Sequence, residues 1–308
     1  MQMQKFIYLP FWFLKAKFLG KKNPLQSVVF INDECNLACK HCCVYSRGKQ
    51  PRINSYEEVK ANLEYCYSLG SRFIDFEGGE PFLWKDATNP NDVKDINSLF
   101  RLAKEIGFYS CTVTTNAQID FSHCVADSIW VSMDGIGKYH DAVRGNGAFE
   151  KLAKNIDINP HPQLSVNMVI NTLNYQSVKE TIEFVKNHKK IKSIAINFHT
   201  PYPSTEYLML DWETRRKIID EIIEMKKAGY PIMNSVSGLK LMKSNDFEKH
   251  CWVTNFVMVD GTKYAECQGK TAGICADCGF CMAGEMRSVF ALKPDTVIDG
   301  MKLRVFGR

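Results

Sequence analysis

With 308 residues the chain is long enough for one large α/β domain and a small appendage, and its 45% of apolar residues can supply a sizeable core. The charged fraction is 24% and the formal net charge is only +5, so composition predicts no nucleic-acid partner. Twelve cysteines are too few for a disulfide scaffold of this length, and their short, clustered spacings favour metal binding in a reducing, cytoplasmic compartment.

The first 22 residues form a hydrophobic and basic segment. Phe6 to Leu14 is almost unbroken in apolar and aromatic character, and four lysines follow it. The run is too short to span a bilayer, and no small-residue cleavage site of a secretory signal follows it. Two interpretations remain open: a structural cap or dimer contact, or a peripheral anchor at the inner face of a membrane. The anchor would place Trp12 and Phe13 in lipid and the lysines towards headgroups.

From residue 26 onward, short apolar runs alternate with longer helical patterns, which is typical of a parallel βαβ array. The strands and their following loops are expected at 26–32, 72–81, 109–117, 128–135, 163–171 and 193–201, and the helices at 56–70, 96–107, 149–156, 178–188 and 212–229. This order predicts an α/β fold, a partial (β/α)6 TIM-like barrel over residues 26–235, with the active site at the carboxyl ends of its strands. Residues 1–25 precede the barrel, and a small cysteine-rich module is expected over 236–308.

Three cysteines directly follow the first predicted strand. Cys35, Cys39 and Cys42 have the spacing C-x3-C-x2-C, and Cys43 is taken as a neighbour of the group. Three thiolates on one short loop can hold three irons of a 4Fe-4S cube and leave the fourth iron open. The alternative is a zinc site, although structural zinc is normally bound by four protein ligands that leave no open coordination position.

This cysteine spacing after a first barrel strand resembles the radical S-adenosylmethionine (SAM) superfamily, and the resemblance extends through most of residues 26–200. It implies an enzyme in which SAM binds the open iron and is cleaved to a deoxyadenosyl radical by an electron from a reductant such as flavodoxin or ferredoxin. The stretch Gly78, Gly79, Glu80 and Pro81 resembles the family's GGEP motif, which implies contact with the methionine ammonium of SAM. Glycine permits a close backbone approach, and Glu80 can accept from an ammonium group.

Two later motifs extend the resemblance. Asn116 ends a stretch that is similar to the family's TNG-like turn near the SAM ribose, with Ala117 in place of the usual glycine. Residues 131–152 resemble the branch that contains sulfatase maturases and peptide-modifying enzymes. That resemblance implies polar contacts to SAM from Ser132 and Arg144, whose guanidinium suits a carboxylate. Asp134 is a further candidate, the alternative being a turn residue after a strand.

A second cysteine group lies near the C-terminus and resembles the SPASM and shorter twitch extensions, which bind auxiliary iron-sulfur clusters. The spacing differs from the family's, because five residues separate Gly261 from the next cysteine. The resemblance implies a second 4Fe-4S cluster, with structural zinc or free thiols as alternatives. The candidate ligands are Cys251, Cys267, Cys275, Cys278 and Cys281.

These motifs do not identify the substrate. The hydrophobic N-terminus favours a lipid or isoprenoid small molecule, and the layout is also similar to short radical SAM proteins that adenosylate hopanoid lipids. The SPASM-like tail favours the alternative of a peptide or protein maturase. A non-catalytic iron-sulfur carrier is the alternative of another class. Candidate lining residues of a substrate pocket are His199, Tyr202 and Glu206.

Overall fold

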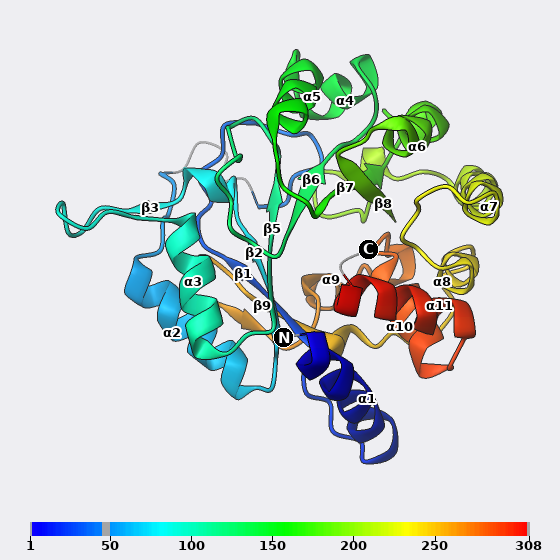
Figure 1. Ribbon diagram of the computed structural model, residues 1–308. Helices are drawn as coiled ribbons and strands as arrows, with labels where there is room; N and C mark the ends of the chain where they lie inside the picture. The colour runs from blue at the N-terminus through cyan, green and yellow to red at the C-terminus, as the bar shows by residue number, and fades with distance from the viewer. Residues whose placement is uncertain (1, 45–49, 307–308) are drawn as a thin grey trace. The chain divides into compact units, whose positions relative to one another are not determined.

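The computed structural model describes residues 2–44 and 50–306. Eight strands form one sheet in the order β10-β9-β1-β2-β5-β6-β7-β8, and the β3-β4 pair forms a separate hairpin. All six predicted strands and all five predicted helices are present, so the prediction of an α/β fold with a largely parallel sheet is confirmed (Figure 1). The strands are β1 (Gln26–Phe30), β2 (Phe73–Glu77), β3 (Lys85–Asp86), β4 (Lys94–Asp95), β5 (Ser110–Thr115), β6 (Ser128–Ser132), β7 (Leu164–Ile170), β8 (Ile191–Phe198), β9 (Thr254–Val257) and β10 (Lys263–Tyr264).

Several of the longer helices begin or end at capping residues. Ser55 and Glu58 form a reciprocal capping box at the start of α2, and the Asp211 carboxylate accepts from Thr214 N at the start of α7. Gly107 ends α3 with a φ of 114°, which a residue with a Cβ rarely adopts. The helices are α1 (Gln2–Phe18), α2 (Tyr56–Ser68), α3 (Ile96–Ile106), α4 (Lys138–Arg144), α5 (Ala148–Ile158), α6 (Val178–Asn187), α7 (Trp212–Lys227), α8 (Val236–Leu241), α9 (Gln268–Thr271), α10 (Met282–Phe290) and α11 (Pro294–Met301).

The chain packs as two compact units, which are described separately. The first contains residues 1–38, 44–130 and 251–267, and the second contains residues 39–43, 131–250 and 268–308. This division crosses the three predicted segments, 1–25, 26–235 and 236–308, whose boundaries stay a prediction. Its consequence for the cysteines is direct: Cys35, Cys251 and Cys267 belong to the first unit, and the other five candidate ligands belong to the second.

In the first unit, α2 and α3 cover one side of β1, β2 and β5 (Figure 1). The ring of Phe76 on β2 packs edge to face on Phe100 of α3, with 5.5 Å between ring centroids. Strand β9 pairs in parallel with β1, and β10 pairs antiparallel with β9. The sequence pattern missed β9 and β10 because four and two residues are too short to establish a period-two pattern.

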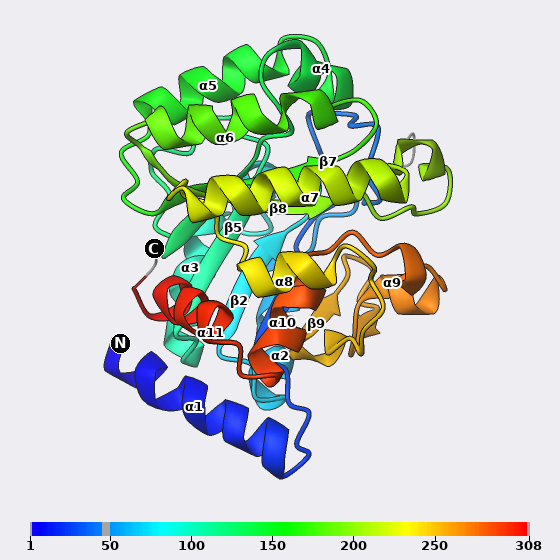
Figure 2. The ribbon, with the colours of Figure 1, turned by 90° about the vertical axis from the view of Figure 1, so that its right-hand side faces the viewer.

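In the second unit, β7 and β8 form a parallel pair, and buried and half-buried residues alternate along β7. Helices α8, α10 and α11 lie side by side in Figure 2, although no long helical pattern was expected before about Arg287. These helices are short and contain glycines, which weaken a helical period. At Gly284 the missing side chain has a packing reason, since a Cβ there would lie 2.5 Å from the Gly238 carbonyl oxygen.

Candidate functional site

The glycines of the GGEP motif lie against the backbone that leads into the first cysteine. Gly79 N donates to Asn32 O over 2.8 Å, and Glu80 N donates to Glu34 O over 2.7 Å. A Cβ at Gly78 or Gly79 would overlap that backbone, so both positions require glycine. The motif therefore shapes the entry to the cysteine loop in addition to its predicted part in SAM binding.

Glu80 is fully buried and ties the end of β5 to the GGEP loop. Its Oε1 accepts from Thr115 Oγ1 over 2.8 Å, and its Oε2 accepts from Asn116 N over 2.8 Å. Phe82 N donates to Oε1 over 3.2 Å. These bonds fix the orientation of the Glu80 carboxylate, which accepts through both of its oxygens.

Asn116 connects the end of β5 to the first cysteine. Its Nδ2 donates to Asn36 Oδ1 over 2.8 Å and lies 3.6 Å from Cys35 Sγ as a donor to sulfur. The next residue, Ala117, adopts a φ of 56° where the family usually has glycine. This left-handed backbone costs an alanine about 1 kcal/mol, so the turn is kept despite the missing glycine.

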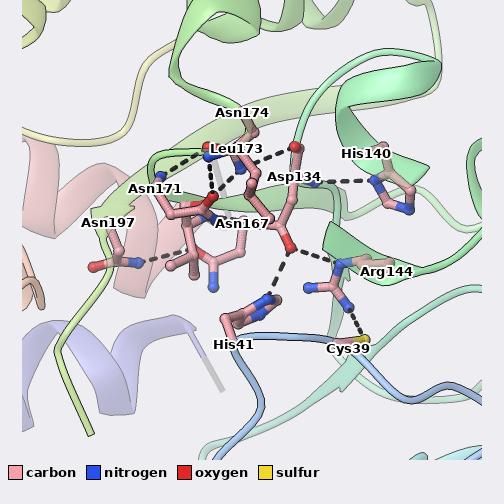
Figure 3. Close-up of polar contacts among 11 residues, drawn as sticks. Cys39, His41, Asp134, His140, Arg144, Asn167, Asn171, Leu173, Asn174 and Asn197 are labelled. Carbon is pink, nitrogen blue, oxygen red and sulfur yellow. Dashed lines mark hydrogen bonds and ion pairs between the residues drawn. The ribbon is translucent and has the colours of Figure 1, made fainter. Parts of the chain in front are cut away.

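In the second unit, Asp134 is the centre of a buried polar network (Figure 3). Its Oδ2 accepts from Arg144 Nε over 2.6 Å and lies 3.7 Å from His41 Nε2, while Oδ1 accepts from Val169 N over 2.8 Å. Burial by itself would raise the pKa of Asp134, but the positive charge of Arg144, together with His41, outweighs it and holds the pKa below its ordinary value. Asp134 is thus an ionised partner of Arg144 as well as a residue after a strand.

His140 braces the same network from α4. Its Nδ1 accepts from Asp134 N over 3.1 Å. Burial and, after it, the charge of Arg144 lower the pKa of His140 to about 4, so the ring is neutral at pH 7. A neutral ring can accept at Nδ1, which a protonated ring could not do.

Arg144 joins Asp134 to the cysteine loop. Its Nη1 donates to Cys39 Sγ over 3.8 Å (Figure 3). Lys40 N donates to the neighbouring Val143 O over 2.9 Å. The guanidinium is only 8% exposed, so its charge acts on the sulfur with little screening. Two of its donors therefore serve Asp134 and Cys39, and the predicted contact with the SAM carboxylate stays a prediction. Ser132, at the end of β6, is half-buried, and its predicted contact also stays a prediction.

Polar side chains that sequence patterns did not single out lie between β7 and β8. Asn197 Nδ2 donates to Asn167 Oδ1 over 2.9 Å, and the hydroxyls of Ser165 and Ser193 lie 3.0 Å apart. Polar residues at alternate positions of an otherwise apolar strand were the available signal. His199, by contrast, has its Nε2 2.9 Å from Thr205 O, within its own loop.

The loop that carries three of the C-terminal cysteines is bonded to the end of β8. Cys281 N donates to Asn197 Oδ1 over 2.9 Å, and Phe198 N donates to Gly279 O over 2.9 Å. A Cβ at Gly279 would overlap the Phe198 carbonyl. Cys278 and Cys281 are buried, and Cys275 is half-buried. This part of the predicted auxiliary site is therefore built against the carboxyl end of a sheet strand.

Cysteine thiolates are the usual protein ligands of iron-sulfur clusters, so the residue types present suit such a cluster. No disulfide joins the twelve cysteines, all of which lie within the described residues. Cys35 and Cys39 each receive a hydrogen bond suited to a thiolate. In the part of the chain that the structure describes, no three cysteine, histidine or acidic side chains converge closely enough to bind one metal ion together. A 4Fe-4S cube takes each thiolate on a different iron, so its ligands converge less than those of a single ion.

The sequence is similar to curated proteins of known activity. It is 28% identical over 273 residues to the Fe-coproporphyrin III synthase of Methanosarcina barkeri, an alignment that covers 79% of this chain and 63% of that protein. It is 23% identical over 124 residues to the mycofactocin maturase MftC of Mycolicibacterium smegmatis, covering 40% of this chain and 31% of the relative. The chain thus spans less than two thirds of either relative.

Solved structures share the fold at low identity. SuiB of Streptococcus suis, bound to its precursor peptide SuiA, superposes with a TM-score of 0.61 at 17% identity, covering 91% of this chain and 68% of SuiB. The protein anSMEcpe with bound AdoMet gives 0.59 at 16% identity, covering 92% of this chain and 84% of the other. The family profile of the radical SAM superfamily matches residues 29–185, more than half of the chain, including the C-x3-C-x2-C loop, the GGEP motif and Arg144. The chain belongs to the radical SAM superfamily, whose members are enzymes that bind a 4Fe-4S cluster and SAM.

Proposed function

We propose that this protein binds a 4Fe-4S cluster through Cys35, Cys39 and Cys42 and cleaves SAM reductively. The observation that carries the proposal is the hydrogen bonding of the cysteine sulfurs: Asn116 donates to Cys35, and Arg144 donates to Cys39. When bound, the cluster would supply the electron that converts SAM into methionine and a deoxyadenosyl radical. The chain's own residues would hold the thiolates, position SAM and exclude water.

The residues around the cysteines have separate parts in this proposal. Asp134 holds Arg144 by an ion pair, and Arg144 places positive charge beside the Cys39 thiolate. Hydrogen bonds and charge near cluster sulfurs set the reduction potential. Gly78, Gly79, Glu80 and Pro81 would receive the SAM ammonium, and Asn116 would lie near the ribose. Ser132 would make a polar contact to SAM, and Arg144 would contact its carboxylate.

Anaerobic incubation with SAM and dithionite, or with reduced flavodoxin, tests this activity. The reconstituted protein should form deoxyadenosine at a rate that depends on both SAM and the reductant, because the chain would bind both cluster and SAM. A protein that carries iron and sulfide but forms no deoxyadenosine would instead be an iron-sulfur carrier, which needs neither Glu80 nor Arg144.

For the second cysteine group we propose a metal–thiolate centre, a 4Fe-4S cluster, with ligands among Cys251, Cys267, Cys275, Cys278 and Cys281. The support is chemical: five cysteines lie within 31 residues, and three of them are on a loop bonded to the end of β8. Structural zinc is the competing centre, because paired cysteines suit tetrahedral sulfur coordination equally well. Iron, sulfide and zinc analysis separates the two.

We propose a hydrophobic, lipid-like substrate taken from a membrane surface, and helix α1 supports this. One face of α1 packs within its unit: Trp12 is buried, its Nε1 donates to Asn23 O over 2.9 Å, and Tyr8 donates to Gly70 O over 2.7 Å. The opposite face exposes large apolar side chains, each at least half exposed: Met3, Phe6, Ile7, Phe11, Leu14 and Phe18. Such a helix with lysines at its end suits an anionic bilayer interface. Among the described residues, no helix has the length and apolar character to cross a membrane.

Serine substitution of Phe6, Phe11 and Phe18 should abolish flotation with vesicles of anionic phosphatidylglycerol, which the unaltered protein should bind. These rings point away from the packed face, so the fold should persist while membrane affinity falls by about a hundredfold or more. The lysines predict weaker flotation with neutral vesicles. If neither protein floats but the substitution dissociates a dimer in gel filtration, the exposed face is a contact between copies.

A peptide substrate is the second candidate, because the mycofactocin maturase is a relative and SuiB was solved with a precursor peptide. The protein with serine at Phe6, Phe11 and Phe18 distinguishes a lipid-like substrate from a peptide substrate. Loss of turnover only when the substrate is presented in vesicles would support the lipid-like substrate, whereas turnover of a soluble peptide that survives the α1 substitutions would support a maturase.

A further inference from the structure

Arg215, on α7, is a buried arginine beside the C-terminal cysteine loop. It is only 2% exposed, which is rare for this side chain. Its Nη2 donates to Cys278 O over 2.9 Å, and its guanidinium lies 4.8 Å from the Phe198 ring centroid and 4.6 Å from that of Trp212. Two aromatic faces and one carbonyl thus hold the group in place.

Within the part of the chain that the structure describes, no carboxylate lies at ion-pair distance from the charge of Arg215. Among the same described residues, its Nε has no hydrogen-bond partner. Burying an uncompensated charge costs several kcal/mol, which aromatic contacts repay only in part. If ionised, Cys281 and Cys278 would act on the charge of Arg215 more strongly than Asp277 does.

Neutral thiols would not compensate this charge. A buried cysteine thiol that binds no metal is neutral and offers a guanidinium no negative charge. A metal deprotonates its cysteine ligands outright, and a centre with several thiolates carries net negative charge. The buried guanidinium is therefore complementary to a metal-loaded loop and unmatched by a metal-free one.

We propose that Arg215 is a positioning residue, the buried counter-charge of an anionic metal–thiolate centre that includes Cys278 and Cys281. This inference rests on the metal centre proposed above for the second cysteine group. It applies to an iron-sulfur cluster and to zinc alike, because the shared chemistry is a negatively charged set of thiolates. It also explains why an arginine lies where the pattern of α7 would place an apolar residue, among the buried Ile218, Ile219 and Ile222.

The test uses the full chain with Cys35, Cys39 and Cys42 replaced by alanine, so that bound metal reports only on the second centre. Arg215→Met removes the charge at similar length, Arg215→Lys keeps it, and Arg216→Met changes the exposed neighbour as a matched control. After anaerobic reconstitution, iron, sulfide and zinc are measured, together with metal loss to a chelator and the midpoint potential of any cluster.

Arg215→Met should weaken metal retention by about 10- to 100-fold, the usual effect of removing an outer partner of a metal site. It should also shift a cluster to lower potential, because the positive charge stabilises the more negative reduced state. Arg215→Lys should recover part of both effects, and Arg216→Met should match the parent protein. If the centre binds zinc, which is not redox-active, weaker zinc retention in Arg215→Met alone would support the inference.

Retention and potential unchanged in Arg215→Met would overturn the role of Arg215 while leaving the metal centre standing. A parent protein that binds neither iron nor zinc would remove the proposed centre and the counter-charge role with it. The free energy of unfolding supplies a second readout if reconstitution of Arg215→Met is poor. The substitution should destabilise the metal-loaded form of the protein more than the metal-free form, and equal effects on both would contradict the inference.

Discussion

Replacement of Cys35, Cys39 and Cys42 by alanine should lower the iron content of the reconstituted protein from about eight atoms to about four and abolish deoxyadenosine formation. The three thiolates are the proposed ligands of the SAM-binding cluster, and alanine cannot bind iron. Iron and sulfide are measured by colorimetric analysis, and deoxyadenosine by chromatography after anaerobic incubation with SAM and dithionite.

Two further variants make this result specific. Cys43→Ala changes the exposed neighbour of the loop and should leave both iron content and deoxyadenosine formation unaltered. Joint replacement of Cys275, Cys278 and Cys281 should also leave about four irons, yet the spectral change that SAM causes at the first cluster should persist. Four irons in the unaltered protein, with one zinc that the second variant loses, would replace the auxiliary cluster with a zinc site.

Arg144→Ala should destabilise the protein by about 3–5 kcal/mol, the usual cost of leaving one member of a buried ion pair without its partner. Asp134 is fully buried, and the variant would remove the guanidinium that lies 2.6 Å from its Oδ2. Chemical denaturation of the metal-free protein, followed by circular dichroism, measures the change in the free energy of unfolding without contributions from a cluster.

The charge explanation has an internal control. The double variant Asp134→Leu with Arg144→Met removes both charges and should recover a large part of the lost stability, because a buried pair replaced by apolar groups is often nearly neutral. Arg101→Ala, at an exposed position of α3, should change stability by less than about 0.5 kcal/mol. A loss below about 1 kcal/mol in Arg144→Ala would show that Asp134 is compensated by its other partners.

Local patterns were sufficient to predict six of the strands and five of the helices in their chain order. Alternating burial in β7, the capping box at Ser55 and the glycine stop at Gly107 each depend on residues within a few positions of one another. The cysteine loop and the GGEP motif are equally local, so the resemblance to the superfamily depends on residue types and spacings alone. The very short β9 and β10 carried no such local signal.

The partners of the functional residues were decided only by the tertiary structure. Asn116 reaches Cys35 across 81 positions of sequence, Arg144 reaches Cys39 across 105, and Arg215 reaches the Cys278 carbonyl across 63. Sequence motifs suggested that Asn116 and Arg144 serve SAM, whereas the folded chain also directs them to cysteine sulfurs. Residue types and spacings determined which chemistry this protein carries, because metal ligation and tight turns need particular side chains at fixed intervals. Long-range packing decided which charge lies beside which sulfur, because a buried charge is stabilised by groups that are distant in sequence and no local period records where those groups lie.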